Sequence, residues 1–194
     1  MRLFAIGGTV VVMIGAGLLA PELVQEDAMP AQVLLVHHAS ADQGVDARRV
    51  VFENCATQRN LSTKGRVEAQ AMGASLRDLG FRITKVIASP FCRTIETAEL
   101  MHAGTVEPVA AFQNLRANAQ DAATLRKLDE ARRIIESWHG PGSLLIVTHS
   151  STIKALTGSD PVDGKFVVYT KPQRDETVAH LPPGSDKLME TRTF

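Results

Sequence analysis

Short runs of apolar residues recur along this chain, and three of them end in side chains that can carry chemistry. The sequences VLLVHHAS over residues 33–40 and LLIVTHSS over residues 144–151 pass from branched apolar residues to histidine and then to small or hydroxyl residues. Such apolar runs are typical of strands that are buried on both faces. A third run, VIA over residues 86–88, leads into the sequence SPFCRTIETA. Because open α/β sheets bind their ligands at the carboxyl ends of strands, we expect these three ends to form one cationic site.

Helical periodicity separates the predicted strands. Ser62 is placed to cap a helix that ends with Gly80 as a left-handed cap. The residues predicted to face the core from this helix are Val67, Ala71, Met72, Leu76 and Leu79. Ser89 is predicted to cap a second helix, with Pro90 at its first position and its end near Met101.

The second half of the chain continues the same alternation. Asp121 is predicted to begin a helix that ends near Gly140. Its predicted inward residues are Leu125, Leu128, Ala131, Ile134 and Ile135. Residues 109–110 with their neighbours are predicted to form a short strand. Residues 166–169 and 177–179 are two predicted late strands that would form an edge hairpin.

Alternating strands and helices at these spacings favour right-handed crossovers and a mainly parallel sheet. The predicted fold class is therefore α/β, with a three-layer α/β/α sandwich. Residues 39–60 contain no sustained periodicity and are predicted to form a long loop. A loop of such length in a compact domain usually covers a site or carries one.

Composition limits the partners that the protein can have. The chain has 194 residues, with 44% hydrophobic and 22% charged residues, which is ordinary for a soluble globular protein. Its 21 basic residues are balanced by 21 acidic residues. Nothing in this balance indicates a nucleic-acid-binding surface, so we expect no nucleic-acid partner.

The amino-terminal segment predicts export. Met1 and Arg2 provide a small positive region, and residues 3–20 are apolar or small throughout. Residues 1–20 are therefore predicted to be a secretory signal peptide or, because their length is at the border of what spans a bilayer, an uncleaved membrane anchor. A linker over residues 21–31 would lead into one domain over residues 32–194. The predicted location is the periplasm, either free or anchored to the membrane.

Export changes the interpretation of Cys55 and Cys92. In an oxidising compartment two cysteines can form a disulfide, and both flank the predicted site in the sequence. Two buried thiols are the alternative, because the sequence does not give the separation of the two side chains.

Taken together, the motifs resemble those of the histidine phosphatase (phosphoglycerate-mutase-like) superfamily over residues 33–158. The pair His38-Ala39 resembles the catalytic histidine and the small residue that follows it in that family. Residues 60–71 resemble its Leu-Thr/Ser-x-x-Gly-x-x-Gln-Ala helix, and residues 89–98 resemble its second phosphate-binding arginine motif. Residues 148–150 resemble its second histidine motif, with Ser150 where glycine is common.

The resemblance implies a phosphoglycerate-mutase-like fold and a phosphatase mechanism. Neutral His38 would attack a phosphomonoester to give a phosphohistidine, which water then hydrolyses. Arg93 would bind the phosphoryl oxygens through its planar fork of donors, and His149 would donate to them in the transition state. The resemblance implies neither a metal nor another cofactor, because side chains supply the cations. The substrate would be a small phosphorylated molecule or a phosphorylated envelope component.

Three positions depart from the family pattern or remain open. The first arginine of the family is His37 here, which would bind phosphate only when protonated and would then favour activity at mildly acidic pH. Arg59 is a candidate to replace the missing arginine. Asp121 is the candidate general acid, although the plainer interpretation is a helix N-cap.

Two alternatives therefore stand beside the phosphatase hypothesis. A catalytically silent relative would bind phosphate or a partner, and His37 is its best support. A metal-binding protein would use His37, His38 and His149, but adjacent residues of a strand point to opposite faces, which argues against a shared metal.

Overall fold

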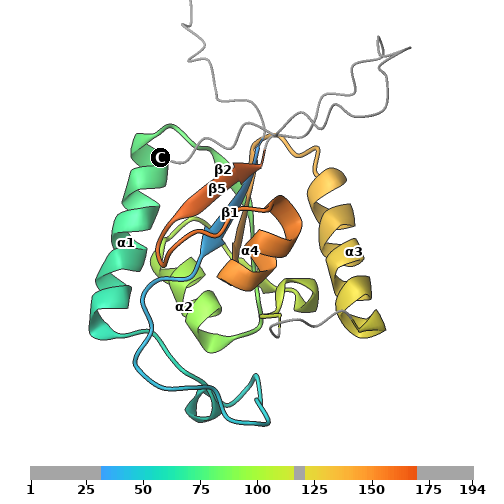
Figure 1. Ribbon diagram of the computed structural model, residues 1–194. Helices are drawn as coiled ribbons and strands as arrows, with labels where there is room; N and C mark the ends of the chain where they lie inside the picture. The colour runs from blue at the N-terminus through green and yellow to red at the C-terminus, as the bar shows by residue number, and fades with distance from the viewer. Residues whose placement is uncertain (1–31, 116–120, 170–194) are drawn as a thin grey trace, which may run out of the picture.

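The computed structural model describes residues 32–115 and 121–169, which build a five-stranded sheet between two layers of helices (Figure 1). The strands lie in the order β3-β2-β4-β1-β5. Their bounds are β1 Val33–His37, β2 Ile83–Ala88, β3 Val106–Pro108, β4 Ser143–Thr148 and β5 Phe166–Tyr169. All neighbours pair in parallel except β5, which lies antiparallel to β1 at the edge. The fold is therefore α/β with a mainly parallel sheet, as the sequence predicts.

Four helices cover the two faces of the sheet. They are α1 Thr63–Asp78, α2 Cys92–Leu100, α3 Ala122–Glu136 and α4 Ser150–Thr157. Residues of α1 and α2 share one buried cluster with one face of the sheet, and residues of α3 and α4 share a second cluster with the other face. In Figure 1 the sheet lies between α1 and α3. These three layers are those of the predicted sandwich.

The two central strands explain why apolar runs rather than alternating patterns mark this sheet. In β1, Leu34 and Val36 contact the α1/α2 cluster, whereas Val33 and Leu35 contact the α3/α4 cluster. All four side chains are at most 1% exposed. β1 and β4 are thus buried on both faces, and their pairing ends with His37 opposite Thr148.

Helix α1 begins and ends as predicted, but its buried face is different. The Ser62 hydroxyl accepts a hydrogen bond from the Gly65 backbone, and Gly80 has a φ of 77°. The predicted inward residues Val67 and Leu79 are 64% and 48% exposed, and Ala71 is exposed as well. The buried residues are Gly65, Ala69, Gly73 and Leu76.

Close backbone contacts explain this difference. A Cβ atom added at Gly65 would lie 1.9 Å from the Ser40 carbonyl oxygen, and one at Gly73 would lie 2.1 Å from that of Met101. The helix therefore approaches the long loop and the end of α2 through residues without side-chain bulk, and a pattern of apolar residues does not reveal such a face.

Three further boundaries correct the sequence prediction. Helix α2 begins at Cys92 with Phe91 as its N-cap, because the Ser89 hydroxyl lies 2.9 Å from His149 Nε2 instead of capping the helix. The short strand predicted around residues 109–110 lies earlier in the chain, since β3 ends at Pro108 and the 3-10 helix η2 (Ala110–Phe112) follows.

Helix α3 is capped by Asp121 as predicted, but it ends at Glu136 rather than near Gly140. Leu125, predicted to face inward, is 51% exposed. The predicted strand over residues 177–179 lies outside the described residues, as does the predicted signal or anchor segment. In the part of the chain that the structure describes, no helix has the length and apolar character needed to cross a membrane.

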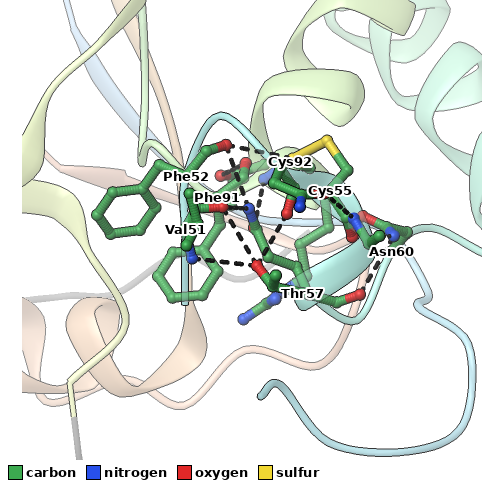
Figure 2. The surroundings of a disulfide bond; sticks show 12 residues. Val51, Phe52, Cys55, Thr57, Asn60, Phe91 and Cys92 are labelled. Carbon is green, nitrogen blue, oxygen red and sulfur yellow. Dashed lines mark hydrogen bonds between the residues drawn. A yellow bond between two sulfur atoms is a disulfide. The ribbon is translucent and has the colours of Figure 1, made fainter. Parts of the chain in front are cut away.

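The long loop between β1 and α1 is tied down at both ends and in the middle. Ala41 bridges to Leu61, and the 3-10 helix η1 (Cys55–Thr57) interrupts the loop. A disulfide joins Cys55 to Cys92 at the start of α2 (Figure 2). The alternative of two separate thiols is thereby excluded in this structure.

Candidate active site

The ends of β1 and β4 bring two histidines together. His38 follows β1 directly, and its backbone N–H donates to the Thr148 carbonyl at the end of β4. His149 follows β4 and forms the N-cap of α4. Both side chains are 2% exposed, and their ring centroids are 5.4 Å apart. The sheet thus places the two predicted histidines in contact range beneath the surface.

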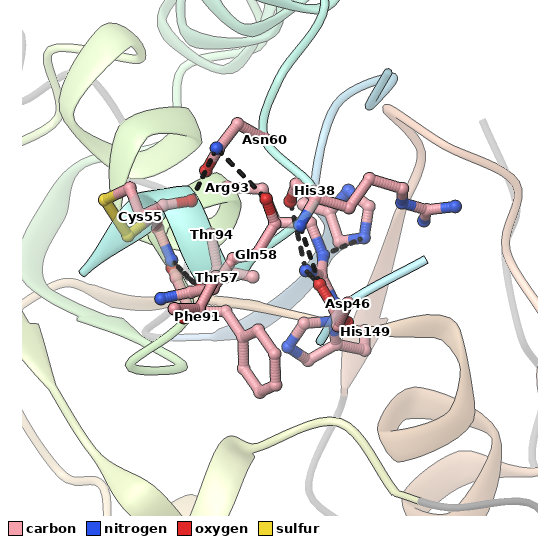
Figure 3. Close-up of polar contacts among 12 residues, drawn as sticks. His38, Asp46, Cys55, Thr57, Gln58, Asn60, Phe91, Arg93, Thr94 and His149 are labelled. Atoms are coloured by element: carbon pink, nitrogen blue, oxygen red, sulfur yellow. Dashed lines mark hydrogen bonds and ion pairs between the residues drawn. A yellow bond between two sulfur atoms is a disulfide. The ribbon is translucent and has the colours of Figure 1, made fainter. Parts of the chain in front are cut away.

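Arg93 joins the two histidines from the first turn of α2. Its guanidinium is 2% exposed, and its Nε donates to His38 Nε2 at 3.2 Å. Its Nη2 lies 3.4 Å from His149 Nδ1, and its Cζ lies 4.5 Å from the centre of the Phe91 ring. The three strand ends therefore bring His38, His149 and Arg93 together in one cluster, as the sequence predicts (Figure 3).

His38 is held as a neutral imidazole with its Nε2 lone pair directed at Arg93. Its Nδ1 lies 2.8 Å from the Ala39 carbonyl oxygen, which fixes the proton on Nδ1. Burial, assisted by the neighbouring His37 and the Arg93 charge, lowers the pKa of His38 to about 3. An imidazole in this state presents an unprotonated Nε2 at neutral pH, which is what a nucleophile requires.

His149 is neutral for similar reasons. Burial and then the Arg93 charge lower its pKa well below the ordinary value. Arg93 donates toward Nδ1, so the ring proton is on Nε2 and faces the Ser89 hydroxyl. Ser89 therefore positions His149, a role that the sequence prediction of a helix cap missed.

The structure adds a carboxylate that the sequence analysis did not single out. Asp46, in the long loop, binds both terminal nitrogens of Arg93, with Nη1–Oδ1 at 3.0 Å and Nη2–Oδ2 at 3.3 Å. Its Oδ1 also accepts from the backbone N–H of Arg59 at 2.8 Å. The length of the loop was the only signal that it carries a site residue.

His37 reaches the same region but does not act as a simple substitute for arginine. It is 8% exposed, and its Nδ1 lies 3.1 Å from the Pro161 carbonyl oxygen and 3.3 Å from Asp163 Oδ1. Burial lowers the pKa of His37, while Asp163 and the nearby carbonyls act in the opposite direction. The protonated form that the sequence analysis requires is therefore formed at a lower pH than that of an ordinary histidine.

His37 and Asp163, together with His38, are side chains of the kinds that bind metal ions. Ligand atoms of His37, His38 and Asp163 all lie within 4.8 Å of one another. The expectation that adjacent histidines point apart is wrong here because His38 lies beyond the last residue of β1, and their ring centroids are 4.4 Å apart. The Arg93 charge next to His38 Nε2 repels a cation at this position.

Arg59 is close enough for its charge to act on the site. It contributes to lowering the pKa of His38, Arg93 and His149. Its carbonyl oxygen accepts from Arg93 Nη1 at 3.2 Å. Its half-buried guanidinium has no hydrogen bond or ion pair with any other described residue, so it is available to an anion. Its phosphate-binding role stays a prediction.

The position of Asp121 disfavours the predicted role as general acid. Its side chain caps α3 by accepting from the backbone N–H groups of Ala123 and Thr124. The hydrogen bond from the Thr124 backbone is the main cause of its lowered pKa, and the exposed carboxyl is therefore held as an anion. A proton donor needs the opposite shift.

A cavity of about 670 Å³ opens beside the cluster. Asp46 and Phe91 line this cavity and also contact the cluster. Asp46 binds Arg93, and the Phe91 ring centroid lies 4.9 Å from that of His149. Charged residues on the rest of its wall are Arg48, Arg49, Asp121 and Lys127. The cavity gives a molecule bound at the histidines room to extend.

The chain is similar to one known protein family over part of its length. A family model described as histidine phosphatase superfamily (branch 1) matches residues 33–118. A search of curated protein sequences found no match.

Solved structures share the fold at low identity. The protein of open reading frame Rv3214 from Mycobacterium tuberculosis is 15% identical, with a TM-score of 0.57 over 74% of this chain and 93% of that one. A phosphoserine phosphatase mutant from Entamoeba histolytica, in complex with phosphoserine, is 10% identical, with a TM-score of 0.53 over 72% and 90%. A proposed phosphohistidine phosphatase SixA from Nakamurella multipartitia is 20% identical, with a TM-score of 0.52 over 71% and 83%. At these identities the likeness establishes the fold alone.

Proposed function

We propose that the protein hydrolyses a phosphomonoester through a phosphohistidine intermediate on His38, because a family model of the histidine phosphatase superfamily matches residues 33–118. The observation that carries the proposal is the state of His38, a buried neutral imidazole whose Nε2 is directed at a buried arginine. A nucleophile and a phosphate-binding group are thus adjacent before any substrate arrives.

The chemical steps use groups that are already in contact. The His38 Nε2 lone pair forms a bond to phosphorus while the bond to the ester oxygen breaks. Arg93 binds the phosphoryl oxygens with its terminal nitrogens, which requires that Asp46 first leaves them. His149 would present Nδ1 to the same oxygens. Burial disfavours a second proton on the His149 ring, whereas the negative charge of a bound phosphoryl group favours one. Water then attacks phosphorus and releases phosphate and free His38.

The proposed substrate is a small phosphorylated molecule or a phosphorylated envelope component, and the proposed location is outside the cytoplasm. Two observations support export, namely the apolar segment over residues 3–20 and the Cys55–Cys92 disulfide, which persists in oxidising compartments. Cell fractionation should recover the full-length protein from the periplasm or its membrane. Recovery from the cytoplasm alone would contradict this location.

A phosphate-binding protein without turnover is the second candidate, and the observation that favours it is the buried His37 in place of a permanent cation. The variant His37→Arg separates the two functions. Turnover by the wild-type protein supports the phosphatase, whereas turnover by His37→Arg alone would show a silent site on an intact scaffold.

The experiment that tests the proposal is hydrolysis of para-nitrophenyl phosphate by the full-length protein across about pH 5 to 8, the range in which histidine titrates. Wild type, His38→Ala and His37→Arg are compared, and a phosphorylated histidine is sought by mass spectrometry after rapid mixing. The proposal expects a phosphorylated His38 in the wild type. Turnover that persists in His38→Ala would overturn it.

A further inference from the structure

Asp46 occupies the part of Arg93 that a phosphoryl group needs. All three nitrogens of the guanidinium are engaged, Nε by His38 and the two terminal nitrogens by the two oxygens of the Asp46 carboxylate. This paired geometry is the one by which arginine binds either a carboxylate or a phosphate. A phosphoryl group at His38 must therefore displace the Asp46 side chain from Arg93.

The cavity beside the cluster offers space for the displaced carboxyl. Asp46 lies in the long loop rather than in the sheet, and its side chain is 23% exposed. It forms part of the wall of the cavity beside the cluster. The ester group that leaves phosphorus departs on the side opposite to the attacking His38. A carboxyl that leaves the phosphoryl oxygens but stays at the cavity wall would remain close to the ester group of a substrate that extends into the cavity.

The other described acids near the site have different tasks. Asp121 caps α3, and Asp163 contacts His37 Nδ1. Glu68 accepts from the Ser40 backbone N–H and pairs with Lys64. Asp46 is the acid among the described residues that contacts the catalytic cluster directly and also faces the cavity.

We propose that Asp46 is the proton donor to the leaving group, and that its contact with Arg93 is the resting position from which the substrate displaces it. The inference rests on the proposed function and names a catalytic residue that the sequence motifs do not contain.

The proton balance is complete with groups already named. A phosphomonoester has its second pKa near 6, so a fraction of the substrate arrives as a monoanion with one proton. Once Arg93 binds the phosphoryl oxygens, the Asp46 carboxylate no longer pairs with this cation and lies beside the phosphoryl group. The substrate proton passes to Asp46 and then to the ester oxygen as the bond to phosphorus breaks. In the second half of the reaction, Asp46 takes a proton from the attacking water and returns it to the product phosphate, which leaves as the monoanion, so that the Asp46 carboxylate can bind Arg93 again.

The test compares two esters that differ in their need for a proton. The para-nitrophenolate ion leaves without protonation, whereas the less acidic phenol of phenyl phosphate benefits from a donor. We expect Asp46→Asn to lower kcat for phenyl phosphate by about 10²-fold to 10⁴-fold and kcat for para-nitrophenyl phosphate by much less. Asp46→Glu, which keeps a carboxyl group, should restore part of the phenyl phosphate activity.

Controls separate this role from a structural one. Asp42→Asn makes the same charge change at an exposed position of the same loop and should alter neither rate. Loss of an ion pair with a buried arginine also lowers stability, so each variant is assayed well below its own unfolding temperature. An equal loss for both esters in Asp46→Asn, or a selective loss in Asp121→Asn instead, would overturn the inference.

A binding measurement distinguishes failure of the inference from failure of the proposed function. Calorimetry with vanadate should show tighter binding to Asp46→Asn than to wild type, because the competing carboxylate is gone. Wild-type protein that binds vanadate but hydrolyses neither ester would refute the phosphatase and the inference together. Wild-type turnover with unchanged vanadate affinity in Asp46→Asn would refute the inference alone.

Discussion

The strand ends and the long loop contribute to the site in different ways. His38 and His149 follow the paired strands β1 and β4, whose backbone hydrogen bonds hold the register up to His37 opposite Thr148. The loop over residues 39–62 has no such ladder. It is held by scattered contacts, among them Asp42 to Asn60 and the disulfide to α2. In Figure 1 it extends away from the end of the sheet.

This difference assigns different tasks to the two regions. The sheet fixes the nucleophile and its partners, which must not move during bond formation. The loop supplies Asp46, a group that must leave Arg93 when a phosphoryl group arrives. The rigid part of the site thus comes from the sheet, and the displaceable part comes from the loop.

The largest effect is expected at the strand end. Replacing His38 by alanine removes the nucleophile, and we expect turnover to fall by more than about 10³-fold. Because Arg93 and His149 remain, vanadate binding should persist, which calorimetry can measure. A variant that loses vanadate binding as well would show that His38 also holds the scaffold together.

The second effect concerns the loop. Replacing both Cys55 and Cys92 by serine opens a cross-link with a sequence separation of 37 residues, and the chain-entropy cost predicts a loss of about 3–4 kcal/mol in the free energy of unfolding. Urea denaturation measures it, with reduced wild type as the matched sample. Hydrogen exchange should accelerate in the loop and hardly change in β1 and β4. Equal acceleration in both regions would contradict the division proposed above.

The same division explains which site residues the sequence reveals. His38, His149 and Arg93 each follow a recognisable apolar run, and the rules of parallel sheets bring such run ends together. Their convergence was therefore predictable without any knowledge of the loop. The mainly parallel sheet and the three layers were predictable for the same reason, since they follow from the alternation of strands and helices.

Residues that depend on tertiary contacts were not predictable. Asp46 has no motif around it, and its meeting with Arg93 depends on how an irregular loop folds back. Asp163 likewise meets His37 across a sequence separation that no local pattern encodes. The buried face of α1 was missed because Gly65 and Gly73 contact backbone atoms, which a hydrophobic pattern does not register.

A third prediction follows from the burial that the sheet imposes on the histidines. The pKa of His38 is lowered from 6.5 to about 3, so between these values the unfolded chain binds a proton that the folded protein does not. Stability is therefore fully present above about pH 6.5 and decreases as the pH falls, by up to about 1.4 kcal/mol per pH unit for each such histidine. Urea denaturation between about pH 6.5 and 5 measures the slope. In His38→Gln it should be shallower, and an unchanged slope would mean that His38 is not buried as a neutral ring.

The smallest expected effect concerns the charge of His37, the last residue of β1, and whether that charge depends on a neighbouring loop. Asp163 contacts His37 Nδ1 and raises its pKa against the stronger effect of burial. Asp163→Asn should lower the pKa of His37 further, by a fraction of a pH unit because the 46% exposed carboxylate is screened by water. If protonated His37 binds the phosphoryl group, the pH profile of kcat/KM shifts to lower pH in this variant, and in His37→Arg the same substitution shifts nothing. If Asp163→Asn also shifts the pH profile of the His37→Arg variant, the group that titrates in this profile is not His37. If both results are found, the charge of His37 in β1 depends on Asp163 in a loop. The sheet and the loops would then differ in how firmly they hold their side chains, but not in their influence on charge.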